Sequence, residues 1–114
     1  MIDYHFCNQT ITVYRLEGSR VLRLVVPGCY YFWQVQQVTD VYGTRQETKC
    51  LLIVPGESQQ VFVGDRIYEG VGPEVTAREW PAFLPVTVPG LAEITYVRPV
   101  WWDGKISHIE AGNQ

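Results

Sequence analysis

The chain has 114 residues, of which 46% are hydrophobic and 18% charged, and its net charge is −3. This length and composition predict one globular domain over residues 1–114, without a membrane-spanning run of about 18 apolar residues. The basic residues are scattered along the chain, which argues against a protein that grips nucleic acid through a concentrated basic face. The polar stretch 1–5 lacks the pattern of a signal peptide, so we expect an intracellular protein.

Three strands are predicted first, at residues 10–14, 21–26 and 30–38. In the first strand, β-branched and polar residues alternate, which places Ile11 and Val13 on the inner face. In the third strand, Tyr31, Trp33 and Val35 share one face, as in a strand that is half buried.

The tripeptide Val-Pro-Gly occurs at 26–28, 54–56 and 88–90. Because proline lacks an amide donor and glycine permits positive φ, each tripeptide predicts a place where a strand ladder stops and the chain turns. Residues 40–48 form the longest polar stretch, which predicts an exposed loop or an extended hairpin tip. Residues 50–54 are continuously apolar, and this run predicts a strand buried on both faces.

The middle of the chain contains a second candidate hairpin. Gly64-Asp65 lies between two strand-like segments, 59–63 and 66–69, and such a dipeptide suits a type II′ turn. Residues 70–90 have the least strand character, so this stretch predicts a long connection.

Within that connection, Thr76–Glu79 fits the capping-box pattern. Pro81 follows closely and limits the helix to about one short turn near 76–80. Trp80, Phe83 and Leu84 are expected to fold back as an apolar plug. About six to seven strands with almost no helix predict an all-β fold, either a small antiparallel β-barrel or a sandwich.

The closing hairpin, 94–110, carries the strongest local signal in the chain. Asp103-Gly104 at its tip suits a type I′ turn, which needs positive φ at both central positions. Pro99 indicates an edge strand or a bulge, because it cannot donate to a ladder. A two-residue turn pairs Trp102 with Lys105, Trp101 with Ile106, and Arg98 with Ile109.

Trp101 and Trp102 are neighbours on one strand, so their side chains point to opposite faces. We expect one of them in the core and the other facing solvent or a partner. Two interpretations of the outer ring remain open. It forms a cation–π contact with Lys105 inside the monomer, or it anchors a partner protein.

No residues in the sequence form a recognisable catalytic or metal-binding pattern. Cys7, Cys29 and Cys50 are an odd set without close spacing, typical of free thiols in a reducing cytoplasm. His5 and Cys7 lie two residues apart, but the paired spacings of structural zinc sites are missing. Nucleophile, phosphate-loop and metalloprotease motifs are also missing. We therefore expect no enzyme activity, no metal and no cofactor.

Four segments are informative when they are taken in order: 7–14 (Cys-Asn-Gln-Thr-Ile-Thr-Val-Tyr), 51–56 (Leu-Leu-Ile-Val-Pro-Gly), 64–67 (Gly-Asp-Arg-Ile, with Gly70 shortly after), and 108–112 (His-Ile-Glu-Ala-Gly). Together they resemble the small minor capsid or head–tail connector proteins of tailed phages and of Firmicutes prophages. The resemblance covers most of the chain.

This resemblance implies a structural virion protein of the head-closure or stopper class. Such a protein is a small β-barrel-like subunit that forms a ring beneath the portal and adaptor, retains packaged DNA and docks the tail. The resemblance implies partners on the portal or adaptor side and on the tail side, with self-association during assembly. It implies neither sequence-specific nucleic acid nor a membrane as a partner. The expected location is the host cytoplasm during assembly and then the head–tail junction of the virion.

Two surfaces follow from this interpretation. In the class that the chain resembles, an extended loop between strands reaches toward the channel, and 40–48 matches it by position and polarity. The candidate loop residues are Asp40, Tyr42, Arg45, Gln46 and Glu47, and the candidate partner surface on the closing hairpin consists of Trp101, Trp102, Arg98 and Lys105. The alternative is a β-domain that binds a small ligand or carbohydrate through the exposed aromatics Tyr30, Trp33, Trp101 and Trp102.

Overall fold

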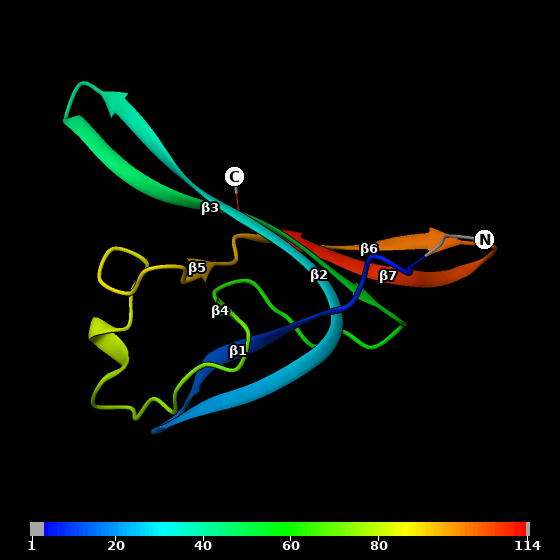
Figure 1. The fold of residues 1–114 in the computed structure, drawn as a ribbon. Helices are drawn as coiled ribbons and strands as arrows, with labels where there is room; N and C mark the ends of the chain where they lie inside the picture. The colour runs from blue at the N-terminus through cyan, green and yellow to red at the C-terminus, as the bar shows by residue number, and fades with distance from the viewer. Residues whose placement is uncertain (1–3, 114) are drawn as a thin grey trace.

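The computed structural model describes residues 4–113 and is all-β, with seven antiparallel strands in one sheet (Figure 1). The strands are β1 (Gln9–Glu17), β2 (Arg20–Asp40), β3 (Gly43–Pro55), β4 (Arg66–Glu69), β5 (Ala92–Glu93), β6 (Tyr96–Trp102) and β7 (Lys105–Gly112). Their order across the sheet is β5-β4-β1-β2-β3-β7-β6. The all-β class is therefore confirmed. The sheet is open at its edge strands, β5 and β6, so the barrel or sandwich stays a prediction.

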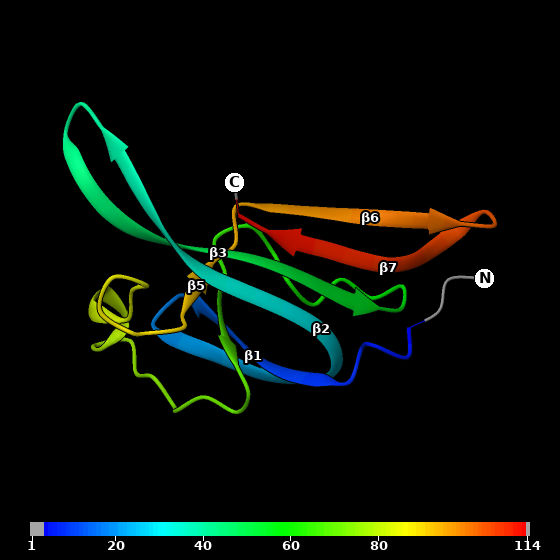
Figure 2. The same ribbon diagram turned by 45° about the horizontal axis from the view of Figure 1, so that its top comes forward.

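The second strand, β2, has 21 residues and serves both halves of the sheet (Figure 2). It pairs with β1 up to Cys29 and with β3 from Tyr30 onward. At the change of partner, Pro27 and Gly28 form a β-bulge in which Gly28 has a φ of 72°, a conformation that glycine adopts without strain. The prediction that this Val-Pro-Gly ends a strand is wrong, because the tripeptide bends the strand and changes its partner.

The hydrophobic core lies between the two halves of the bent sheet. One apolar cluster joins Ile11 and Val13 of β1 to Leu52 of β3, Ile67 of β4 and Ile109 of β7. Ile11 and Val13 thus face inward as predicted. Because strands from both halves contribute to this cluster, neither half buries its apolar face without the other.

The second face of β1 is covered by the connection between β4 and β5. Tyr14 is fully buried there, packs edge-on against Phe83 with ring centroids 4.7 Å apart, and donates a 2.6 Å hydrogen bond to the Pro73 carbonyl. Thr12 donates to the Gly70 carbonyl at 2.7 Å and accepts from the Gly72 amide at 2.9 Å. These contacts fix a segment that has little regular structure of its own.

The predicted helical turn and plug are present with small changes. The Thr76 amide donates to Glu79 Oε1 at 3.0 Å and the Glu79 amide donates to Thr76 Oγ1 at 3.3 Å, which completes the capping box. The 3-10 turn η1 (Trp80–Ala82) follows immediately. Phe83 is buried and Trp80 packs beside it, whereas Leu84 lines a surface cavity.

The apolar run 50–54 differs from the prediction. Cys50, Leu52 and Val54 are buried, but Leu51 and Ile53 between them are only half buried. The run is therefore buried on one face, because nothing among the described residues fully covers the outer face of β3.

The predicted hairpin around Gly64-Asp65 is also wrong, since residues 59–63 do not form a strand. The Asp65 carboxylate instead turns the chain back on itself. It accepts from the Phe62 amide at 2.8 Å and from Arg15 Nε and Nη2 at 2.8 and 2.7 Å. A buried carboxylate must be satisfied in this way, so the segment is held by side-chain bonds rather than by a ladder.

Candidate assembly surfaces

The two long hairpins project from the body at opposite ends, and they give a molecule of 45 × 35 × 22 Å (Figures 1 and 2). One is the closing hairpin, β6–β7. The other is the far end of β2–β3, from Phe32 to Thr48, which we call the arm. The residues predicted to form partner surfaces lie on these two projections.

The tip of the closing hairpin has the predicted turn. Asp103 and Gly104 have φ values of 53° and 80°, which is the pattern of a type I′ turn. Trp102 is paired with Lys105 and Trp101 with Ile106, as predicted.

Below the tip, a bulge between Val100 and Trp101 changes the register. Arg98 therefore lies opposite Glu110 and not opposite Ile109, and Arg98 Nη2 forms a 2.7 Å ion pair with Glu110 Oε2. The predicted edge position of Pro99 is confirmed, since β6 is an edge strand.

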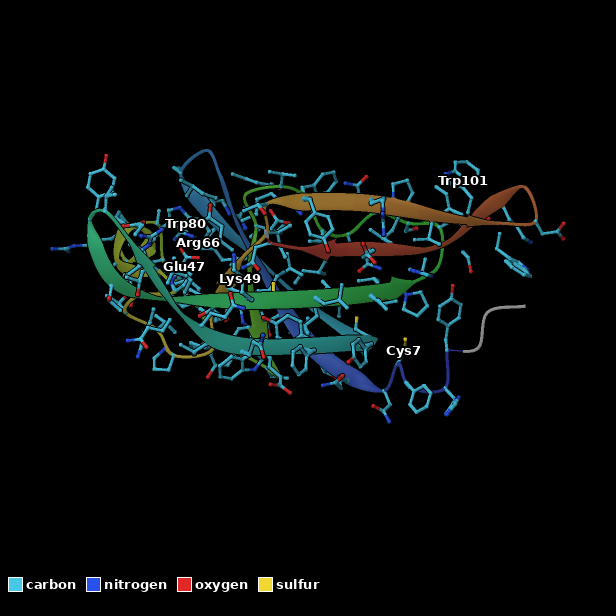
Figure 3. All side chains as sticks on the ribbon, turned by 90° about the horizontal axis from the view of Figure 1, so that it is seen from above. Cys7, Glu47, Lys49, Arg66, Trp80 and Trp101 are labelled. Atoms are coloured by element: carbon cyan, nitrogen blue, oxygen red, sulfur yellow. The ribbon has the colours of Figure 1, made fainter. Side chains whose placement is uncertain are left out.

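The prediction that one tryptophan of the pair is buried is wrong. The exposed fractions of Trp101 and Trp102 are 62% and 50%. The ladder between β3 and β7 begins only at His108, so the tip extends past the sheet, and Figure 3 shows Trp101 near the end of β6. Among the described residues, no cation–π contact joins Trp102 to Lys105. Both indole rings are therefore available to a partner.

The arm is a regular two-stranded ribbon, which agrees with the expected hairpin tip. Within it, β2 pairs with β3 from Tyr30 to Asp40 without a register shift. At the tip, Val41 and Tyr42 are 92% and 94% exposed. These are the most exposed large apolar side chains of the described residues.

A row of charges follows one face of the arm. Glu47 accepts from Arg45 Nε at 3.1 Å and lies 3.6 Å from Lys49 Nζ. Arg45 also pairs with Asp40, and this hydrogen bond, together with one from the Tyr42 amide, holds the pKa of Asp40 below its ordinary value. Gln46 points to the other face and is exposed. The structure therefore places all the candidate loop residues on the arm, as strand and turn residues.

Two carboxamide side chains end the ladders on either side of the arm. Gln9 bonds to both backbone groups of Tyr31, at 2.9 Å to the amide and 3.0 Å to the carbonyl. Asn113 accepts from the Cys50 amide at 3.0 Å and donates to the Thr48 carbonyl at 2.7 Å. Each side chain forms the backbone hydrogen bonds that a residue of a neighbouring strand would otherwise form. The sequence patterns identified neither residue.

Two surface cavities of about 450 Å³ each flank the arm, between it and residues 84–95. Trp33 lines one of them, and its indole N–H donates to Glu69 Oε2 at 2.8 Å. Val35 and Val86 line the same cavity and are 53% and 84% exposed. The space beside the arm is thus partly apolar and open.

The ionisable groups elsewhere have ordinary structural roles. Burial raises the pKa of Cys29 and of Cys50 to about 11, so both thiols are protonated at neutral pH and are poor nucleophiles. Tyr4 Oη bonds to Ser107 and to His108 Nδ1, the latter at 2.7 Å. Within residues 4–113, no three side chains of the metal-binding types cluster together. The same part of the chain contains no helix with the length and hydropathy to span a membrane.

The geometry thus defines the class of protein as an open all-β domain with two exposed hairpins. No family model, no curated protein and no solved structure matches this chain.

Proposed function

We propose that this chain is a non-enzymatic structural component of the head–tail junction of a tailed phage or prophage. In this role it joins a ring that closes the filled head or docks the tail. The observation that carries the proposal is the presence of two unlike, exposed hairpins at opposite ends of one small domain (Figure 1). The sequence resemblance supplies the biological setting.

Ring assembly requires two different surfaces on each subunit. In a head-to-tail contact, one patch binds a different patch on the next copy, and a suitable rotation closes the ring. The closing hairpin offers Trp101 and Trp102, a residue type enriched at the centres of interfaces. The body and arm of the next subunit offer the open cavity lined by Val35 and Val86.

The same proposal assigns partners and location. The ring lies between the portal or adaptor and the tail, after assembly in the host cytoplasm. A net charge of −3 suits a protein that surrounds packaged DNA without binding it tightly. Neither sequence-specific nucleic acid nor a membrane is a partner in this proposal.

The test uses the purified chain and the portal–adaptor complex of the phage that carries it. We expect binding and a ring visible by electron microscopy. A variant with Trp101→Ser and Trp102→Ser should remain folded and fail to join the ring, whereas Val71→Ser, a change at an exposed apolar residue away from both hairpins, should join it. Absence of binding, together with normal head closure in a phage lacking the gene, would reject the proposal.

A β-domain that binds a small ligand or carbohydrate is the second candidate. Trp33 supports it, because this ring lines a cavity of about 450 Å³ beside the arm. Saturable quenching of tryptophan fluorescence by a sugar on the wild type, lost in Trp33→Leu and retained in Trp101→Ser, would favour this function over ring assembly.

A further inference from the structure

The outer edge of β3 is open along the arm. Asn113 bonds to the Thr48 carbonyl and the Cys50 amide, which shows that even-numbered residues of β3 direct their backbone groups to this side. Backbone groups alternate along a strand, so those of Thr44 and Gln46 also point outward. The described residues give them no backbone partner. A row of free donors and acceptors is a template for another strand.

A surface cavity adjoins this edge. This cavity of about 450 Å³ lies between Gln46–Lys49 and the facing residues 84–86. An isolated two-stranded ribbon is marginally stable in water, whereas three or more strands with an apolar face are stable. An added strand would therefore strengthen the arm.

The sequence of the edge identifies the strand that fits it. Residues 44–48 read Thr-Arg-Gln-Glu-Thr. This segment is symmetric about Gln46, with threonine at both ends and opposite charges on either side of the centre. An antiparallel copy of the same segment places Arg45 opposite Glu47 twice and Thr44 opposite Thr48 twice. Opposite charges and threonine pairs are favourable cross-strand neighbours.

We propose that two copies of this chain pair through the open edges of their β3 strands, antiparallel and centred on Gln46. The two arms then form one four-stranded sheet, β2-β3-β3-β2. The contact is isologous, because the same edge serves both copies. The Gln46 residues exchange both backbone bonds across the symmetry axis, and each Thr48 amide donates to the Thr44 carbonyl of the other copy.

Three other registers of this pairing are excluded. A centre at Arg45 or Glu47 would place like charges opposite each other, and the backbone groups of these residues point toward β2. A centre at Thr48 needs the Cys50 amide, which already donates to Asn113. The centre at Gln46 joins the free backbone groups of Gln46 and brings complementary charges together, and the Thr48 carbonyl takes a second donor besides Asn113.

The open edge on the other side of the molecule is protected against such pairing. β6 has Pro99, the charged Arg98 and a bulge, which are features that natural sheets use to block added strands. The arm has a continuous register and no proline from Tyr30 to Val54. The β3 edge of the arm thus has neither a proline nor a bulge, and its sequence is self-complementary.

This dimer is independent of the proposed function. An isologous contact closes on itself, so it limits the free protein to two copies. To form a head-to-tail ring, the paired arms would either separate first or remain paired and connect two rings.

Cysteine cross-linking tests the pairing directly, in a Cys7→Ser background that removes the one half-exposed thiol. Residues of a hydrogen-bonded antiparallel pair have Cα atoms about 5.5 Å apart, a distance that a disulfide spans. Gln37 is the matched control, since it lies directly opposite Gln46 on the arm and faces the other edge. Mild oxidation should convert Gln46→Cys to a covalent dimer and leave Gln37→Cys monomeric.

Sedimentation of the uncross-linked protein completes the test. The wild type and Gln37→Pro should sediment as dimers, and Gln46→Pro, which removes the central donor, should sediment as a folded monomer. In an Asp40→Asn background, Arg45→Glu should raise the dimer Kd about tenfold, and the added Glu47→Arg should restore it. A monomeric wild type, or equal cross-linking through residues 37 and 46, would overturn the inference.

Discussion

The interior of the bent sheet and the two projecting hairpins differ in how their polar and apolar groups are satisfied. Inside, the buried polar side chains Thr12 and Asp65 are fully hydrogen bonded. On the projections, Tyr42, Trp101 and Trp102 keep at least half of their surface in solvent, and the arm leaves backbone groups unpaired. The residues that stabilise the fold are therefore different from those that we propose to bind a partner. Each set can be changed without the other.

The largest expected effect is on the interior. Asp65→Ala removes the carboxylate that the Arg15 guanidinium and the Phe62 amide share. Breaking a buried pair removes about 3–5 kcal/mol of the free energy of unfolding, and we expect the lower end here because Arg15 keeps Gln60 and Glu17 as partners. Urea denaturation followed by tryptophan fluorescence measures it. Asp40→Ala is the control, since it breaks an ion pair on the exposed arm and should leave the midpoint unchanged. Similar losses in both variants would contradict the separation of the two regions.

A smaller loss is expected at the bend in β2. Gly28→Ala forces a side chain into the left-handed region, at a cost of about 1–2 kcal/mol. Gly28→Asn should lose less, because asparagine tolerates this conformation. The same denaturation measurement compares them, and an alanine variant as stable as the wild type would show that the bulge does not depend on glycine.

The half-buried His108 near the base of the closing hairpin also predicts a pH dependence. Burial holds the pKa of His108 below its ordinary value of about 6.5, an effect that the nearby Glu110 partly opposes. Between the lower pKa of the folded state and the ordinary pKa of the unfolded state, the unfolded chain binds more protons than the folded chain. The free energy of unfolding should therefore fall as pH decreases through this window and should be constant above it. Thermal melts from pH 7.5 to 5 measure the slope, and His108→Gln should reduce it. An unchanged slope in that variant would assign the effect to other groups.

The smallest effect on stability is expected at the projecting tips. Trp101→Ser and Trp102→Ser should each change the free energy of unfolding by less than about 0.5 kcal/mol, although we expect them to abolish the proposed ring assembly. Trp80→Ser is the contrasting variant and should destabilise the fold. The Trp80 ring centroid lies 3.8 Å from Arg66 Cζ, and the ring packs against a buried cluster. Figure 3 shows Trp80 and Trp101 far apart. A large loss of stability from Trp101→Ser would show that Trp101 contributes to the stability of the fold, as the interior residues do.

Local patterns predicted the parts of the fold that depend on neighbours in the chain. Period-two alternation identified β1 and its inward residues, and Asp103-Gly104 identified the type I′ turn. The sequence pattern also placed the candidate residues on two exposed hairpins. It predicted that one tryptophan of the pair is buried, because it had no means of showing that the tip extends past the sheet.

Most of the remaining errors share one physical cause, which is contact between distant parts of the chain. Asp65 was interpreted as a hairpin-turn residue. Its partner Arg15 lies on β1, far away in the sequence, so no local pattern could indicate the ion pair. The bulge beside Val100 is a local exception: Pro99 indicated an edge strand or a bulge but did not show which residues the bulge would shift, and the partner of Arg98 changed. Gln9 and Asn113 end ladders whose neighbours are known only from the fold.

The shared strand β2 also determines how the chain can acquire its structure. Because one continuous backbone belongs to both halves of the sheet, neither half is an independent folding unit. The ladder of β3 with β7 joins the middle of the chain to residues near its end, and contacts of such long sequence separation slow folding into the millisecond-to-second range. Until β7 docks, Ile109 and Ala111 are missing from the core. The core is therefore complete only when β7 is paired with β3.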